Sequence, residues 1–181
     1  APTATPVVTI YDLQYQASDA GSGTACYDSD YDQRLVQTSG YVSGVGSSGF
    51  YLQQAATAAE WKGIYVYDSS YLSSVAVGDY VTLDATVAEY YGMTELTYVT
   101  SLTVGSSGNT LTPASVSTGT LGVDCSTSGE PYEGVLVTIT GASATGDADS
   151  YGQIPIDDGS GETELEDSLL DTDGYLEDLL G

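Results

Sequence analysis

The chain has 181 residues and carries two basic residues, Arg34 and Lys62, against 26 acidic ones, so its formal net charge is -24. Two cations cannot line a groove that binds phosphates, because such binding depends on Lys and Arg that release counterions, and nucleic acid is therefore not expected as a partner. The chain contains no histidine, which excludes a Ser-His-Asp or Cys-His catalytic relay. No apolar run approaches the ~18 residues of a membrane span.

The composition favours β structure. The chain has 16 Tyr against one Trp and one Phe, together with 22 Gly, and tyrosine is a good strand former. A surface with so many uncompensated carboxylates is typical of a soluble, self-repelling protein, and adaptation to salt is the alternative. We predict an all-β protein that is secreted and works in the extracellular space or at the cell surface.

The N-terminus predicts an extended arm followed by a strand. Residues 1–6, APTATP, offer hydroxyls for O-linked glycans, and their prolines disfavour helix. Residues 7–13, VVTIYDL, have the pattern of a strand. This strand is either an ordinary edge strand or one given to a neighbouring subunit. The expected assembly residues are Val7, Val8, Thr9, Ile10, Tyr11 and Leu13.

Two acidic segments have fragments of a calcium-loop pattern. Asp28, Asp30 and Asp32 recur at every second position, and Asp171 and Asp173 precede a glycine. The carboxylates of the first group can converge only if the backbone loops, as it does in calcium sites, and the glycine and distal glutamate of an EF-hand are absent there. The alternative is a solvated acidic loop, and calcium is the one cofactor considered.

The only cysteines are Cys26 and Cys125. An even count in a chain that looks extracellular predicts a disulfide between them. Two cysteines without histidine make no zinc site.

The centre of the chain predicts a run of strands. Residues 35–53 read as strand, glycine turn and strand, and residues 61–67 form a further strand. Residues 75–97 alternate apolar and polar side chains on both sides of a turn, at which Gly92 is expected to take a positive φ.

Tyrosines in these strands form a candidate ligand face, consisting of Tyr65, Tyr67, Tyr90 and Tyr91. Such rings can stack on bases or sugars, or they can simply cover a sheet. The nearest pairs of carboxylates that could hydrolyse a glycoside are Glu89 with Glu95 and Glu130 with Glu133. Nothing in their sequence surroundings indicates a raised pKa, so no catalytic residue and no enzymatic activity is predicted.

After the strands, residues 105–131 read as a linker rich in Ser, Thr and Gly, and residues 132–140 as a buried strand. Residues 152–156 and 162–170 complete a second lobe. The tail, residues 167–181, places leucines among acids and predicts a short amphipathic helix.

Several of these segments together resemble the OB-fold module that is attached to secreted bacterial nucleases of the endonuclease/exonuclease/phosphatase class. The similar pieces are residues 75–97, GYV at 40–42, GFYLQ at 49–53, GIYVY at 63–67 and EPYEGVLV at 130–137. The resemblance covers residues 34–104 well. It implies an OB-like Greek-key barrel, whereas the catalytic domain of those nucleases, with histidine, aspartate and asparagine around a metal, has no counterpart here.

The predicted organisation is an arm and donor strand at residues 1–13, an OB-like β-barrel at 14–104, a linker at 105–131, and a second smaller β-lobe with an acidic tail at 132–181. The predicted function is a non-catalytic structural subunit of an extracellular filament or surface layer, which assembles with copies of itself through the N-terminal extra strand. The alternative is an OB-like module that binds carbohydrate, peptide or nucleic acid for a secreted enzyme. Glycans are a further candidate partner.

Overall fold

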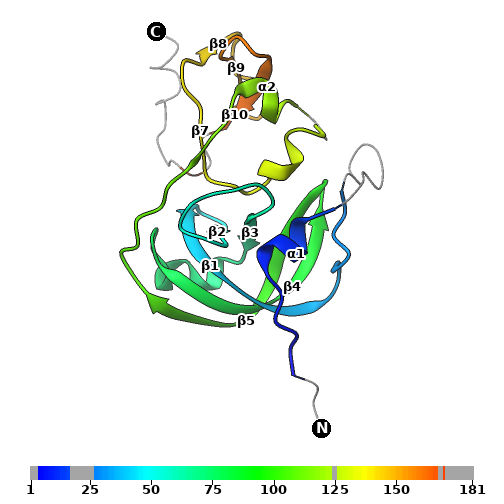
Figure 1. Ribbon diagram of the computed structural model, residues 1–181, viewed down its shortest axis with the longest axis vertical. Coiled ribbons are helices and arrows are strands. Elements are labelled where there is room, and N and C mark those ends of the chain that lie inside the picture. The colour runs from blue at the N-terminus through cyan, green and yellow to red at the C-terminus, as the bar shows by residue number, and fades with distance from the viewer. Residues whose placement is uncertain (1–3, 17–26, 124–125, 167–168, 170–181) are drawn as a thin grey trace.

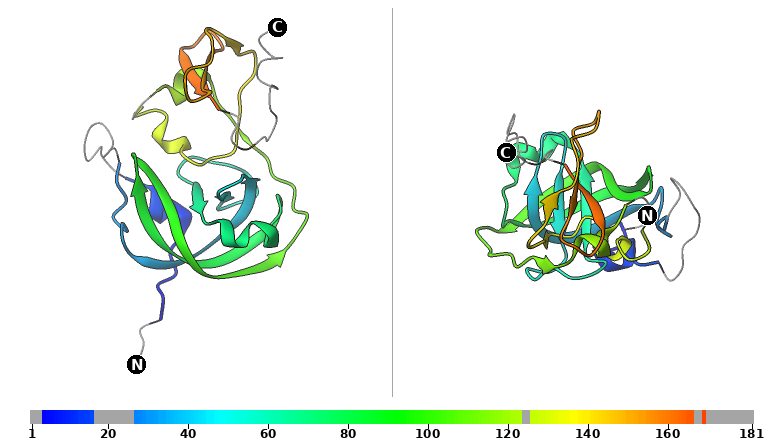
Figure 2. Two further views of the ribbon diagram at one scale, coloured as in Figure 1. Left: turned by 180° about the vertical axis from the view of Figure 1, so that it is seen from behind. Right: turned by 90° about the horizontal axis from the view of Figure 1, so that it is seen from above.

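The computed structural model describes residues 4–16, 27–123, 126–166 and 169. It has a β-barrel at one end and a smaller β-lobe at the other (Figure 1), and both are seen from behind and from above in Figure 2. Among the described residues, no helix has the length and apolar character that a membrane crossing requires.

The barrel consists of β1 (Leu35–Val45), β2 (Phe50–Gln53), β3 (Gly63–Tyr67), β4 (Tyr80–Tyr90) and β5 (Met93–Ser106), with a 3-10 helix, η2 (Ser69–Ser74), between β3 and β4. Its strands close in the order β1-β2-β3-β5-β4. Strand β1 pairs with two neighbours, with β4 along its first part and with β2 along its last part. The β1–β2 pairing has a register shift between Val42 and Gly44. Strands β3 and β5 are parallel and the other neighbours antiparallel. The predicted all-β, OB-like barrel is confirmed.

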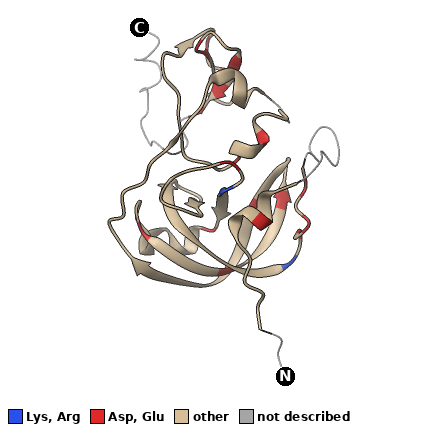
Figure 3. Ribbon diagram, in the orientation of Figure 1, with Lys and Arg blue, Asp and Glu red and all other residues tan. Residues whose placement is uncertain are grey.

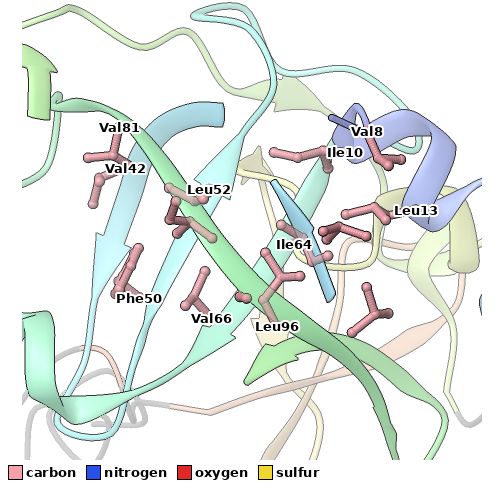
Figure 4. Close-up of a cluster of buried hydrophobic side chains, with 14 residues drawn as sticks. Val8, Ile10, Leu13, Val42, Phe50, Leu52, Ile64, Val66, Val81 and Leu96 are labelled. Atoms are coloured by element: carbon pink, nitrogen blue, oxygen red, sulfur yellow. The ribbon is translucent and has the colours of Figure 1, made fainter. Parts of the chain in front are cut away.

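The predicted strand faces are confirmed as well. Along β4 the side chains of Val81, Leu83, Ala85 and Val87 are fully buried, in the alternation that a strand with one inward face requires. At the β4–β5 turn Gly92 has φ 84° and Tyr91 has φ 51°. Two positive φ values in a two-residue hairpin match the twist of the flanking strands. A cluster of buried apolar side chains lies inside the barrel (Figure 4).

The expected strand over residues 7–13 is wrong. Val7 makes a single parallel bridge to Gln37 and is mostly exposed, and the chain then turns into a short helix, α1 (Ile10–Gln14). Thr9 begins this helix, since its Oγ1 accepts a hydrogen bond from the Asp12 amide at 3.1 Å and donates to the Asp12 carboxylate at 2.6 Å. This reciprocal cap stabilises a helix start against the β propensity of the flanking residues.

Helix α1 closes one end of the barrel with its own apolar side chains. Val8, Ile10 and Leu13 belong to the barrel core, and the last two are fully buried (Figure 4). Helical spacing places positions 10, 13 and 14 on the same face. Each such burial contributes about 1.5–3 kcal/mol, so these residues stabilise this chain's own barrel. Of the expected assembly residues, Val7 and Thr9 remain exposed and Tyr11 is partly buried.

The smaller lobe contains a sheet of β8 (Ser143–Ala144), β9 (Ile154–Asp157) and β10 (Glu162–Leu165) and a two-stranded parallel pair of β6 (Ala114–Ser115) and β7 (Val137–Thr138). Helix α2 (Thr118–Leu121) packs on this lobe, where Thr118 is fully buried and donates to Asp158 Oδ1 at 2.9 Å. The segment expected as a linker therefore carries β6, α2 and a 3-10 helix, η3 (Glu130–Tyr132).

The predicted long buried strand at residues 132–140 is also wrong, because only Val137–Thr138 pair as a strand. Pro131 lies within the first turn of η3, where its fixed φ suits a helix start. The chain after η3 crosses the barrel instead. Gly134 and Gly63 approach so closely that a Cβ on Gly63 would lie 2.3 Å from the Gly134 carbonyl carbon and oxygen. Both positions therefore depend on glycine, and this contact joins the lobe to the barrel.

Candidate functional site

A groove of about 700 Å³ opens on the outer surface of the barrel. We call it the tyrosine groove and define it by six of its lining residues: Tyr67, Asp68, Glu89, Tyr90, Glu95 and Tyr98. Ser47 and Ser48, from the loop between β1 and β2, complete one wall. Its volume is in the range of sites for small molecules and for short stretches of polymer.

The floor of the groove follows from the strand register. Glu95 of β5 lies between Tyr65 of β3 and Ala88 of β4, and one step further Thr97 lies between Tyr67 and Thr86. Because side chains two positions apart share a face of a strand, these two rows point outward together. Alanine and threonine are small, and their positions leave space between the larger tyrosines.

Three tyrosines at the groove are largely exposed. The exposed fractions are 55% for Tyr67, 60% for Tyr90 and 79% for Tyr98. Tyr98 also has φ 50°, a left-handed conformation that is uncommon for residues other than glycine. Such strain persists where the surrounding structure fixes it and is frequent at functional sites.

Asp68 supplies the bonds that hold this conformation. Its Oδ1 accepts from the Ser70 amide at 2.8 Å, which begins η2, and its Oδ2 accepts from the Val99 amide at 3.0 Å. Each carboxylate oxygen thus accepts from one backbone amide, and the Val99 amide directly follows Tyr98 in the chain. Asp68 therefore fixes the backbone of this wall of the groove.

The two glutamates of the groove differ in their bonding. Glu89 Oε1 accepts from the Ser29 amide and from Thr94 Oγ1, both at 2.8 Å, whereas its Oε2 is buried without a partner. Glu95 is only 6% exposed, and in the described part of the chain no donor is hydrogen-bonded to its carboxylate. Burial raises the pKa of both side chains, and for Glu95 the negative charge of Glu89 adds to that effect.

The structure brings the predicted tyrosines into one region. Tyr67 and Tyr90 line the groove, Tyr91 contacts Tyr90 edge to face at 4.7 Å, and Tyr65 lies 6.4 Å from Tyr67 between ring centroids. Burial raises the pKa of Tyr65 to about 12, with further contributions from its neighbours Tyr51, Glu95 and Tyr67. Sequence reasoning missed Tyr98, whose outward position depends on the irregular part of β5.

The members of each predicted carboxylate pair lie near one another in the fold. Glu89 and Glu95 line the same groove, and the backbone amide of Glu133 donates to the Glu130 carbonyl at 2.9 Å. Glu133 Oε1 accepts from Gln14 Nε2 at 3.2 Å and from the Thr94 amide at 3.0 Å. Burial, together with the charges of Glu130 and Glu89, raises the pKa of Glu133 to about 8. This carboxyl group connects α1, β5 and the segment that enters the second lobe.

The expected calcium loop is not assembled in the residues that the structure describes, since they contain no group of three or more acidic, cysteine or histidine side chains placed to hold a metal ion. Asp30 and Asp32 are exposed on a turn, and Asp28 is partly buried. Spacing alone could not decide this, because the turn does not make the three carboxylates converge. Asp171 and Asp173, the predicted disulfide partners Cys26 and Cys125, and the predicted tail helix lie outside the described residues.

No protein-family model matches the chain, and no curated protein matches it either. Among solved structures, the hypothetical protein YgiW from E. coli is similar, with 18% sequence identity and a TM-score of 0.32, over 40% of this chain and 76% of YgiW. The OB-like assignment therefore depends on the strand order of the barrel itself, and the likeness to YgiW gives no link to secreted nucleases. A likeness this distant leaves the function to be argued from the groove.

Proposed function

We propose that this chain is a non-catalytic binding module that takes its ligand in the tyrosine groove. The observation that carries the proposal is the convergence of three exposed tyrosines on a floor of small side chains. Exposed rings provide rigid contact area at low entropic cost, and OB-type barrels offer oligosaccharides and single strands a surface beside the loops that join β1 to β2 and β4 to β5.

The charge of the chain supports carbohydrate or peptide as the ligand rather than nucleic acid. Neither of the two basic residues lines the groove, and acidic residues are spread over the barrel and the second lobe (Figure 3). A polyanion would be repelled by this surface, because nothing in the groove neutralises its phosphates. The absence of histidine from the sequence and the backbone bonds of Asp68 and Glu89 agree with binding without catalysis.

We place this module in a secreted protein, where it would hold a ligand for an enzyme. The uncompensated acidic composition and the resemblance to modules of secreted nucleases support this location. Assembly of copies into a filament or surface layer stays a prediction. It receives no support from residues 7–13, because their apolar side chains fill the barrel of their own chain.

The test is a comparison of three proteins on carbohydrate and peptide arrays: the wild type, Tyr90→Ala and Tyr151→Ala. Tyr151 is a matched control, since it is 83% exposed on the second lobe, away from the groove. A stacked ring is worth about 1–3 kcal/mol, so Tyr90→Ala should weaken a real ligand at least about fivefold and Tyr151→Ala should not. Equal binding by all three proteins would place the ligand elsewhere.

A further inference from the structure

We infer that the tyrosine groove binds an organic cation, an ammonium or guanidinium group on an alkyl chain, with Glu95 as its counter-ion and the tyrosine rings as its walls. This inference rests on the proposed function, because it concerns the same groove, and it specifies the chemical class of the ligand. Lysine and arginine side chains of a peptide are one source of such a group, and free alkyl amines are another.

The first support is the state of Glu95. Its side chain lines the groove, is 6% exposed and has no hydrogen-bond donor in the described part of the chain. Burial without a protein donor disfavours the charged form of a carboxylate, and burial together with the negative charge of Glu89 raises the pKa of Glu95. An ammonium or guanidinium group provides both the donors and the positive charge that the site lacks.

The second support is the aromatic wall. Tyr67, Tyr90 and Tyr98 are exposed on the same groove, and a cation within about 6 Å of a tyrosine ring is attracted by the negative face of the ring. The chain already uses this contact elsewhere, since the Arg34 guanidinium lies 5.6 Å from the centroid of the Tyr31 ring. Tyrosines beside a carboxylate are suited to a cation on an apolar stem.

The third support is that the chain supplies no cation of its own to this groove. Its lining contains Asp68, Glu89 and Glu95 and no lysine or arginine. A net charge of -24 also raises the local concentration of cations around the molecule. A neutral sugar can stack on the rings and donate hydroxyl protons, but it leaves the negative charge of Glu95 uncompensated, which distinguishes the two ligand classes.

The experiment measures the affinity of the whole chain for four probes by calorimetry at low salt. The probes are a blocked Gly-Lys-Gly tripeptide, its norleucine counterpart, cadaverine and a neutral tetrasaccharide. Norleucine keeps the alkyl stem and removes the charge. Hydrogen bonds to a charged group are worth about 1.5–3 kcal/mol, so the lysine peptide should bind at least about tenfold more tightly than the norleucine peptide. Tighter binding of the peptide than of cadaverine would identify a peptide as the source, and the reverse a free amine.

Glu95→Gln is the matching variant, with Glu164→Gln as its control, because Glu164 is exposed on β10 outside the groove. Glu95→Gln should lose at least about tenfold in affinity for the lysine peptide, and Glu164→Gln should lose little. The contrast between lysine and norleucine on the wild type needs no variant, so it decides the question even if Glu95→Gln folds poorly.

Equal binding of the lysine and norleucine peptides, or a lysine affinity that Glu95→Gln leaves unchanged, would overturn the inference. Binding of the tetrasaccharide alone, with its loss in Tyr90→Ala, would overturn it while leaving the proposed function intact. If none of the probes binds and the arrays also find no ligand that Tyr90→Ala weakens, both fail.

Discussion

Replacing Glu133 by glutamine should make the protein more stable at pH 8 and leave its stability at pH 4.5 nearly unchanged. The carboxyl group lies between α1, β5 and the segment that leads to the second lobe, where it accepts from Gln14 Nε2 and from the Thr94 amide. Burial first, and then the charges of Glu130 and Glu89, oppose its ionisation. Glutamine keeps the accepting oxygen and cannot ionise.

The size and sign of the effect follow from the pKa of Glu133, about 8 in the folded protein against 4.5 for an exposed glutamate. Below pH 4.5 the group is protonated in both states and its stabilising contribution is fully present. Above pH 4.5 the unfolded chain ionises first, so the free energy of unfolding falls by about 1.4 kcal/mol per pH unit until the folded group also ionises near pH 8. The total is roughly 5 kcal/mol as an upper limit, because part of the residue is accessible to solvent.

Urea denaturation at pH 4.5 and at pH 8 measures this, with the fluorescence of Trp61 as the signal. Trp61 is the only tryptophan and lies where the barrel meets the segment that leads to the second lobe. Its backbone amide donates to the Pro131 carbonyl at 2.6 Å. The other acidic groups also titrate, so the informative quantity is the difference between the wild type and Glu133→Gln, with Glu164→Gln as the exposed control. If the two pH profiles run parallel, Glu133 is not held neutral by the fold and the reasoning is wrong.

Three further predictions concern the packing of the chain. Leu13→Ala should lower the free energy of unfolding by about 2–5 kcal/mol in urea denaturation, since Leu13 is fully buried in the barrel core, and a value near zero would mean that α1 does not close the barrel. Deleting residues 1–13 should give a chain that fails to fold, and a folded monomer in sedimentation would instead restore the idea of a donated strand. Thr118→Val removes the hydrogen bond to Asp158 and should therefore lower the stability of the second lobe by about 1–3 kcal/mol. Hydrogen exchange should become faster in β9 and β10 but not in β4. Equally faster exchange in all three strands would mean that this bond does not stabilise the second lobe specifically.

The sequence by itself determined the strands of the barrel. The alternation along residues 80–90 identifies an inward and an outward face, and the glycine at position 92 identifies the turn. Both signals depend only on neighbouring residues, so they can be recognised in the sequence without knowledge of the fold. The start of α1 is also a local signal, in the spacing of Thr9 and Asp12. The strand prediction over residues 7–13 did not use this signal, because it rested on the strand-forming residues there.

The existence of the groove and the burial of Glu95 within it could be found only from the tertiary structure. Glu89 and Glu95 were recognisable as a carboxylate pair, but nothing local indicates that Glu95 is buried and that no donor in the described part of the chain is hydrogen-bonded to it. That burial arises because β5 lies between β3 and β4 in the closed barrel, which places Glu95 beside Tyr65 and Ala88. The raised pKa of Glu133 has the same origin, since α1, β5 and the segment after η3 meet there from distant parts of the chain. Burial and electrostatics depend on neighbours that only the closure of the barrel brings together.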